Sequence, residues 1–307
     1  MSIVEKAAEK LKALPAEPQE PSVAAAAPQR PALKPTAPSV ERLQERARVP
    51  DQPIETAALW HVDLAALKRK GLLPADLEAE LQIANELRRI KRPLLDNAMG
   101  KGAETFVRGK RILVTSAQPA EGKTFTAVNL ALSLARETDF EVLLVDGDIP
   151  KSDITGVLGL SDMPGLMDVL ADEKRTPAEV IVRTDVPNLL VVPAGQRHPL
   201  AAELFRSRRM EYVLDELGGR NPRRLLVFDS SPLLATAESQ VLAAHMGQVV
   251  MVVAAGRTRR QAVFAALKAL NDYQYVGLVL NMSRLSASEG YYNRDYGQNL
   301  KALKGDA

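Results

Sequence analysis

Apolar and polar residues are arranged in blocks from residue 111 to residue 282. Short, almost wholly apolar runs are separated by longer segments in which apolar residues recur at helical spacing. The short runs predict strands and the periodic segments predict helices. Strands that are apolar on both faces and separated by helices are typical of a parallel sheet covered on both sides. The pattern therefore predicts an α/β fold, a doubly wound and mostly parallel sheet with helices on both faces. Strands are expected at 111–115, 141–145, 188–192, 224–228, 249–253 and 276–280, and the main helices at 123–136, 201–217 and 259–271.

The residues near the N-terminus follow other patterns. Residues 2–14 place apolar side chains at helical spacing with charges on the other face, which predicts a short amphipathic helix. A helix of this length is marginal in water, so a frayed terminus and a helix that docks into a partner's groove are both open readings. Nine of the 20 prolines lie between Pro15 and Pro53, and this segment is predicted to be a semi-rigid linker.

A further helix is expected over 75–92, because apolar residues recur there at helical spacing and Pro93 follows. The chain is thereby divided into a docking helix at 1–14, a linker at 15–58, a folded domain at 59–282 and a tail at 283–307. The buried stripe of the 75–92 helix is predicted to consist of Leu77, Leu81, Ala84, Leu87 and Ile90.

Composition narrows the functional classes. The 307 residues include no cysteine and three histidines, so disulfides, thiolate metal sites and cysteine nucleophiles are excluded and a histidine-built metal site is not expected. The net charge of +2 gives no global electrostatic reason to expect nucleic acid or anionic lipid as the main partner. The longest apolar run, Val249 to Ala255, is far shorter than the about 18 residues that span a bilayer, and the N-terminus lacks the features of a signal peptide. We therefore expect a cytoplasmic protein.

A phosphate-binding motif stands directly after the first predicted strand. Residues 117–124, AQPAEGKT, fit the phosphate-loop pattern with Ala117 in place of the first glycine. In this arrangement, backbone N–H groups and the positive end of the following helix hold phosphate oxygens. Lys123 is expected to reach the β- and γ-phosphates of ATP, and the Thr124 hydroxyl to bind Mg²⁺. Nucleotide contacts are expected from Gln118, Pro119, Ala120, Glu121, Gly122, Lys123, Thr124 and Phe125, and from Asn281 at the end of the last strand.

Carboxylates follow two further strands. Asp146 and Asp148 end the second strand and, separated by one residue, point to the same side. Asp229 closes the fourth strand, at the position of a Walker B aspartate that holds Mg²⁺ directly or through water. A single aspartate there could simply cap a turn, but three acidic positions beside one phosphate loop form a far more specific pattern. We predict a magnesium-dependent nucleotide site with Lys123, Asp146, Asp148 and Asp229 as its catalytic residues, and with Thr124, Asp229 and Asp148 around the metal.

The motifs SAQPAEGKT, LLVDGD and LLVFDSSP resemble those of the bacterial tyrosine kinases, P-loop ATPases with an additional aspartate motif called Walker A′. The resemblance covers roughly residues 80–300 and includes the segments GLMDVLADE, NLLVVPAGQ, ELFRSRRMEYVLDEL and VVAAGRT. It implies a P-loop NTPase fold and an ATP-dependent tyrosine autokinase that regulates exopolysaccharide synthesis or export. The segments MSIVEKAAEKLK and IKRPLL are most similar to the exosortase-associated autokinases, whose membrane-spanning activator is a separate polypeptide.

The resemblance also implies how subunits would act on one another. Tyr291, Tyr292 and Tyr296 in the tail would be the phosphoacceptors, presented to the active site of a neighbouring subunit. Asp146 would orient the acceptor hydroxyl and take up its proton late, because a carboxylate is a weak base for a phenol. The implied partners are further copies of the chain and a membrane-spanning activator, which would hold the protein at the inner face of the plasma membrane.

An E-x-x-R-x-x-R pattern, formed by Glu86, Arg89 and Arg92, matches the motif by which the subunits of this family pack into a ring. Spacing of three places these residues along one helix face. The alternative is an ordinary solvated charged face. Because Pro93 follows directly, Arg92 is expected at the end of its helix.

The chain departs from the family in two places. Walker A′ usually reads D-x-D-x-R, but Ile149, Pro150 and Lys151 follow Asp148, so the expected arginine is missing. Lys151 supplies a charge without the bidentate fork of arginine, which leaves a non-catalytic nucleotide-binding regulator as an alternative. Gln118 stands where the partitioning ATPases of the same superfamily carry a second signature lysine, and this difference favours a kinase over a positioning ATPase.

Overall fold

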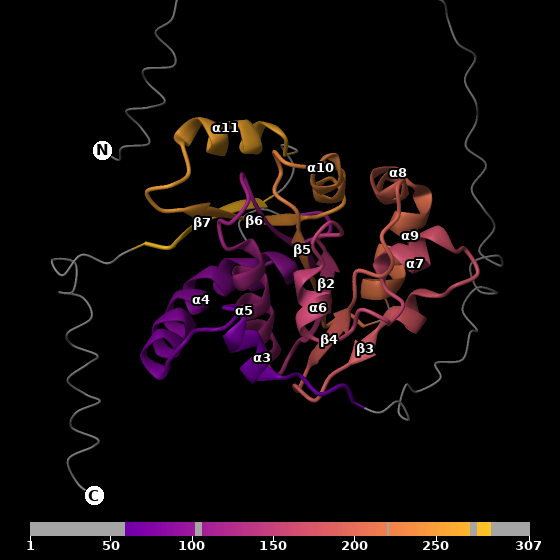
Figure 1. The fold of residues 1–307 in the computed structure, drawn as a ribbon, viewed down its shortest axis with the longest axis horizontal. Helices are drawn as coiled ribbons and strands as arrows, with labels where there is room; N and C mark the ends of the chain where they lie inside the picture. The colour runs from indigo at the N-terminus through magenta and orange to yellow at the C-terminus, as the bar shows by residue number, and fades with distance from the viewer. Residues whose placement is uncertain (1–58, 102–105, 220, 271–274, 284–307) are drawn as a thin grey trace, which may run out of the picture. The chain divides into compact units, whose positions relative to one another are not determined.

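The computed structural model of the chain describes residues 59–101, 106–219, 221–270 and 275–283. The predicted helix at 2–14, the linker at 15–58 and the tail tyrosines Tyr291, Tyr292 and Tyr296 lie outside the described residues, so they stay predictions. The described residues place helices on both faces of one sheet (Figure 1). In this part of the chain, no helix combines the length and the apolar character needed to cross a bilayer.

Seven strands of the described residues pair in the order β3-β4-β2-β5-β1-β6-β7. Neighbouring strands are parallel except β3 and β4, which are antiparallel. The six predicted strands and the mostly parallel sheet are confirmed, with ends shifted by one or two residues. The short β3 was not predicted, because a two-residue strand shows no periodicity. The strands are β1 (Arg111–Ser116), β2 (Glu141–Gly147), β3 (Val182–Arg183), β4 (Leu189–Val192), β5 (Arg224–Ser230), β6 (Gln248–Ala254) and β7 (Tyr275–Asn281).

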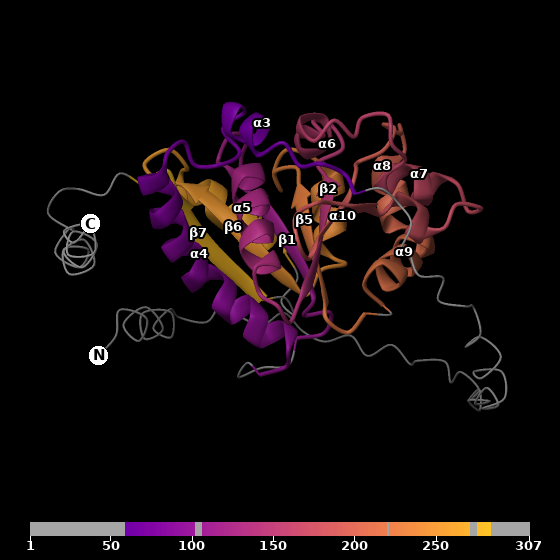
Figure 2. The same ribbon diagram turned by 90° about the horizontal axis from the view of Figure 1, so that it is seen from below.

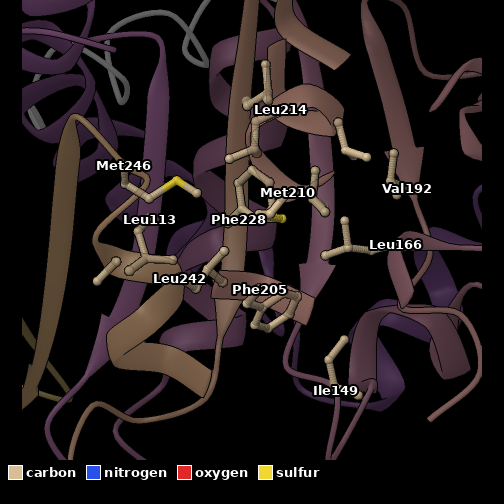
Figure 3. Close-up of a cluster of buried hydrophobic side chains, with 14 of the residues drawn as sticks. Leu113, Ile149, Leu166, Val192, Phe205, Met210, Leu214, Phe228, Leu242 and Met246 are labelled. Atoms are coloured by element: carbon tan, nitrogen blue, oxygen red, sulfur yellow. The ribbon is translucent and has the colours of Figure 1, made fainter. Parts of the chain in front are cut away.

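Successive residues of the central strands enter two different hydrophobic cores, one on each face of the sheet. On β5, Val227 packs in one core and Phe228 in the other, and Ile112 and Leu113 on β1 are divided in the same way. One layer of helices covers each face. The first layer contains α3 (Leu64–Arg69), α4 (Leu77–Ala98), α5 (Lys123–Ala135) and α6 (Asp153–Val157). The second contains α7 (Leu166–Ala171), the 3₁₀ turn η2 (Pro177–Val180), α8 (Ala201–Arg206), α9 (Arg208–Gly219), α10 (Ala237–Ala243) and α11 (Arg260–Lys268). Figure 2 shows the layer with α4 and α5 against the sheet, and Figure 3 shows the core on the other face, around Phe228.

Helix α4 does not end at Pro93, contrary to the prediction, but continues to Ala98 with Pro93 inside it. Its last turn is held by Gln248 of β6, which is fully buried. The Gln248 amide donates to the carbonyl of Leu94 at 3.0 Å and accepts from the Asn97 side chain at 3.0 Å. These buried bonds outweigh the missing proline N–H, so Arg92 lies in the interior of the helix and not at its end.

The predicted buried stripe of α4 is correct only in part. Leu87 is buried and Ala84 and Ile90 are half-buried, but Leu77 and Leu81 are 68% and 49% exposed. Both leucines line a groove of about 900 Å³ between α3, the start of α4 and the end of α5. The first turns of α4 therefore border this groove and are not packed into the core.

The helix predicted over 201–217 is in fact two helices, α8 and α9. Ser207 separates them with an extended backbone, at φ −72° and ψ 159°. Its hydroxyl donates to the carbonyl of Leu204 at 2.7 Å and accepts from the Met210 N–H at 3.3 Å, so it closes one helix and begins the next. A serine also occurs inside helices, so Ser207 within a helical pattern was not a distinct sequence signal for this break.

Candidate functional site

The strand order brings the predicted chemistry to one edge of the sheet. Strand β5 lies between β1 and β2, so the phosphate loop after β1 and the carboxylates ending β2 and β5 are neighbours. Asp146 on β2 is paired in register with Asp229 on β5, and Asp229 is paired with Val114 on β1. This edge is formed by the carboxyl ends of parallel strands, where ligands bind in open α/β sheets.

The phosphate loop has the backbone conformation that an anion site needs. Ala120 and Gly122 adopt left-handed conformations, with φ of 63° and 91°. Gly122 is the N-cap of α5 and no side chain caps that helix start, so the first N–H groups of α5 are available to a ligand. A Cβ at Gly122 would lie 2.0 Å from Nδ2 of Asn281, and the φ of 91° would strain any other residue, so this position favours glycine.

Lys123, the first residue of α5, is 5% exposed and surrounded by acids. Its ammonium donates to Asp148 in a short contact and lies 3.9 Å from Oδ1 of Asp229. It also donates to the Thr124 hydroxyl at 3.3 Å. Burial by itself lowers the pKa of Lys123, but the carboxylates of Asp229 and Asp148 oppose this and raise the pKa overall. Lys123 is therefore held as a cation at the loop.

The remaining oxygens of the three carboxylates differ in how they are held. Ser231 donates its hydroxyl to Oδ1 of Asp148 at 2.7 Å. Oδ2 of Asp146 accepts from the backbone N–H of Thr155 at 2.9 Å and from its hydroxyl at 2.7 Å. Oδ1 of Asp146 and both carboxyl oxygens of Asp229 are buried and have no hydrogen-bond partner among the described residues. Three buried acceptors of this kind at one edge are suited to binding a cation.

Burial raises the pKa of both unsatisfied groups. The pKa of Asp146 rises to about 6, although its bonds from Thr155 lower it. The pKa of Asp229 rises to about 7, because full burial and the Asp146 charge outweigh the attraction of Lys123. One lysine faces three carboxylates, so the edge carries excess negative charge when all three are ionised. A cation would relieve that charge.

These residues fit Mg²⁺ bound together with a nucleotide. The described residues hold no cluster of three or more histidine, aspartate or glutamate side chains that could enclose a metal alone. Mg²⁺ commonly takes only one or two carboxylates and completes its shell with water and substrate phosphates. Asp229 and Asp148, with the Thr124 hydroxyl beside Lys123, supply donors of that kind.

The other predicted site residues are distributed as follows. Gln118, Pro119 and Ala120 are exposed on the loop, whereas Glu121 is buried and Phe125 half-buried. Asn281 does lie at the loop, but its amide donates to the carbonyl of Glu121 at 2.9 Å. The exposed side chains of Glu86, Arg89 and Arg92 on α4 are not among the groups gathered at this edge of the sheet.

Several side chains at this edge were not predicted. Thr155 anchors Asp146, and its hydroxyl also accepts from the N–H of Ala194 at 2.9 Å. Ser231 carried a usable signal, since it stands two residues after the Walker B aspartate. Arg197, from the loop after β4, donates to the carbonyl of Pro150 at 2.6 Å. A guanidinium thus lies against the segment where the expected Walker A′ arginine is missing, although the local sequence gave no sign of it.

Comparison with known proteins decides the family. No protein-family model matches the chain. The tyrosine-protein kinase YwqD of Bacillus subtilis (strain 168) is 31% identical over 187 residues, which cover 60% of this chain and 77% of YwqD. The chain belongs to the bacterial tyrosine kinases.

Other members of the kinase family support the same assignment. The putative tyrosine-protein kinase CapB of Staphylococcus aureus is 29% identical over 203 residues, covering 66% of this chain and 86% of CapB. The crystal structure of the VpsO kinase domain superposes with a TM-score of 0.55 at 25% identity, over 68% of this chain and all of that domain. The predicted kinase family and P-loop fold are confirmed, and membership implies ATP as the nucleotide.

Proposed function

We propose that this kinase is a tyrosine autokinase in which one subunit transfers the γ-phosphoryl group of ATP to Tyr291, Tyr292 or Tyr296 of a neighbouring subunit. The observation that carries the proposal is the edge formed by the phosphate loop, Lys123 and three carboxylates with unsatisfied oxygens. The names of the relatives state tyrosine kinase activity. The motif resemblance of this chain to the family supports a role in exopolysaccharide synthesis or export.

The chain's own residues would act mainly by positioning and by charge. Bound Mg²⁺ would neutralise charge on the phosphates, held by Asp229 and Thr124 with Asp148 in support. Lys123 would bind the β- and γ-phosphate oxygens, and its raised pKa keeps it charged for this task. The free N–H groups at the start of α5 would bind phosphate oxygens beside it.

Asp146 would orient the acceptor tyrosine. Thr155 fixes one of its oxygens through two hydrogen bonds, which leaves Oδ1 to accept from the tyrosine hydroxyl. The pKa of Asp146, about 6, is several units below the pKa of a phenol, about 10. The carboxylate therefore takes up the proton only late, which suits the loose transition state of phosphoryl transfer.

The ring of subunits and the separate membrane-spanning activator also belong to this proposal. Glu86, Arg89 and Arg92 support ring packing because all three side chains are exposed on α4. The similarity of MSIVEKAAEKLK to the exosortase-associated autokinases supports a separate activator that brings the kinase to the inner face of the membrane.

Intact mass spectrometry and phosphotyrosine detection after incubation with Mg-ATP and the activator test the proposal. Wild-type protein should gain phosphates, and a Tyr291→Phe, Tyr292→Phe, Tyr296→Phe triple variant should gain almost none. Tyr212→Phe is the matched control, because Tyr212 is exposed on α9 within the folded domain. A triple variant phosphorylated as fully as wild type would refute the tail as acceptor.

The non-catalytic regulator is the second candidate, and one departure from the family motif favours it. Pro150 stands where Walker A′ usually has arginine. Against this, Arg197 places a guanidinium on the Pro150 carbonyl. Wild-type protein that binds Mg-ATP but gains no phosphate, even with the activator present, would establish the regulator instead of the kinase.

A further inference from the structure

A glutamate is buried inside the phosphate loop, where a negative charge is unexpected. Glu121 is 3% exposed, and both of its carboxyl oxygens are occupied. Oε2 accepts from the backbone N–H of Gln118 at 2.8 Å, across the loop. Oε1 accepts from the hydroxyl of Thr258 in a short hydrogen bond. The side chain therefore joins the outer half of the loop to the turn that follows β6.

The partner on that turn is itself fixed. The Thr258 hydroxyl accepts from the N–H of Ala254, the last residue of β6, at 3.0 Å. The backbone of the same turn is joined to β7, because the Ala255 N–H donates to the carbonyl of Asn281 at 2.8 Å. The Asn281 side chain then donates to the Glu121 carbonyl at 2.9 Å. The loop, the turn and the end of β7 thus form a closed set of hydrogen bonds.

This arrangement runs against simple electrostatics. A nucleotide triphosphate is strongly anionic, and a carboxylate beside it repels it. A buried carboxylate is also costly unless its hydrogen bonds are satisfied. Glu121 meets that condition, since each of its oxygens accepts a bond from a different segment. A glutamate at this place is explained if its hydrogen bonds strengthen nucleotide binding more than the repulsion between its charge and the phosphates weakens it.

We propose that Glu121 and Thr258 are positioning residues of the nucleotide site, which hold residues 118–121 in the shape that turns the backbone N–H groups of Ala120 and Glu121 toward the phosphates. The proposal rests on the proposed function, because it requires ATP to bind at this loop. In this role, neither side chain contacts the phosphates. They act by keeping the loop preorganised, which lowers the cost of ordering it when ATP binds.

A purely electrostatic effect of Glu121 and a positioning role predict opposite changes in Mg-ATP affinity when the side chain is removed. If the carboxylate acts only through its charge, Glu121→Ala removes a repulsion and tightens Mg-ATP binding. If it positions the loop, Glu121→Ala weakens binding although a negative charge is gone. Glu121→Gln keeps an acceptor for the Gln118 N–H and an amide for Thr258, so it should restore binding. Thr258→Val and Thr258→Ser form a second pair, in which only serine keeps the hydroxyl.

Isothermal titration of the full-length variants with Mg-ATP measures these effects, with kinase assays for KM and kcat. Hydrogen bonds to a charged group predict an increase in Kd and KM of roughly 10- to 100-fold for Glu121→Ala and Thr258→Val, with kcat changed less than about threefold. For Glu121→Gln and Thr258→Ser, Kd and KM should stay within about threefold of wild type. The double variant Glu121→Ala, Thr258→Val should bind Mg-ATP no more weakly than the weaker-binding of its two single variants. Thr176→Val is the matched control, since among the described residues the Thr176 hydroxyl bonds only to Glu179, in a capping box on η2.

Two results overturn the proposal: Glu121→Ala that binds Mg-ATP as tightly as wild type or more tightly, or Thr258→Val with an unchanged Kd. If Glu121→Ala does not fold, as judged by its urea unfolding midpoint, the two Thr258 variants decide. Wild-type protein that fails to bind Mg-ATP refutes the proposed function itself and is thereby distinguished from failure of the positioning role.

Discussion

Replacing Asp229 by asparagine should make the nucleotide-free protein more stable than wild type at pH 8. At pH 5 this stability advantage should be much smaller. Asp229 is fully buried, both of its carboxyl oxygens lack a hydrogen-bond partner among the described residues, and Asp146 lies beside it in register. In the folded state, burial raises its pKa from 3.8 to about 7. Ionising it therefore costs the folded protein free energy that the unfolded chain does not lose.

The sign and size of the pH-dependent stability difference follow from this pKa shift. Because the folded pKa is the higher one, the stability contributed by protonated Asp229 is complete below pH 3.8 and is lost as pH rises through about 7. Three pKa units at about 1.4 kcal/mol each give a total of about 4 kcal/mol. About 2–3 kcal/mol of this is lost between pH 5 and pH 8. Asparagine does not ionise, so its variant avoids that loss.

Equilibrium urea unfolding of the full chain in EDTA measures the difference. Trp60 is the only tryptophan of the chain, and its indole N–H donates to the Leu158 carbonyl at 2.8 Å, so its fluorescence reports unfolding of the domain. The stability advantage of Asp229→Asn should grow by about 2–3 kcal/mol from pH 5 to pH 8, with Asp162→Asn as an exposed control. Adding Mg²⁺ and ATP should remove the advantage, because they stabilise wild type. A difference that stays constant with pH would refute the reasoning.

Three further predictions concern the anchoring of Asp146, the last turn of α4 and the subunit ring. Thr155→Val should lower kcat at least tenfold and the free energy of unfolding by about 1–3 kcal/mol, because Asp146 loses a hydroxyl donor and the Ala194 N–H loses its acceptor. Thr155→Ser should restore both quantities in kinase assays and urea unfolding, and a serine variant as impaired as the valine variant would contradict the anchoring role. Gln248→Met should destabilise the domain by about 2–4 kcal/mol in urea unfolding, since buried partners on α4 are left unsatisfied; a loss below about 0.5 kcal/mol would contradict it. Phosphorylation of the tail, at about −1.5 to −2 charges per tyrosine, should lower the oligomer mass in light scattering through repulsion at the acidic site, and equal masses before and after phosphorylation would contradict the proposed release.

The sheet and the carboxylate edge were predictable because they depend on local periodicity and on strand ends. The central strands are apolar on both faces, so Ile112 and Leu113 of β1 could be assigned to a covered strand before their two cores were known. The phosphate loop and Asp229 follow directly after such strands, and parallel strands present their carboxyl ends at one edge.

What the sequence did not predict depends on contacts between distant segments. Pro93 is a reliable local signal for a helix end, but Gln248, about 150 residues later, holds the helix beyond it. The bonds of Glu121 to Thr258 and of Arg197 to Pro150 likewise join segments far apart in the chain. No spacing rule links such pairs, because their meeting depends on the order of strands in the sheet.

Transfer between subunits is tested most directly by mixing two variants that are each incapable of self-modification. Lys123→Met keeps Tyr291, Tyr292 and Tyr296 but loses the cation of the phosphate loop, whereas the triple Tyr→Phe variant keeps the loop but lacks the acceptors. After incubation of the mixture with Mg-ATP and the activator, mass spectrometry should find phosphate on the tail of Lys123→Met. A Lys123→Met tail that remains unmodified in the mixture, while wild-type protein is phosphorylated in parallel, would contradict transfer between subunits.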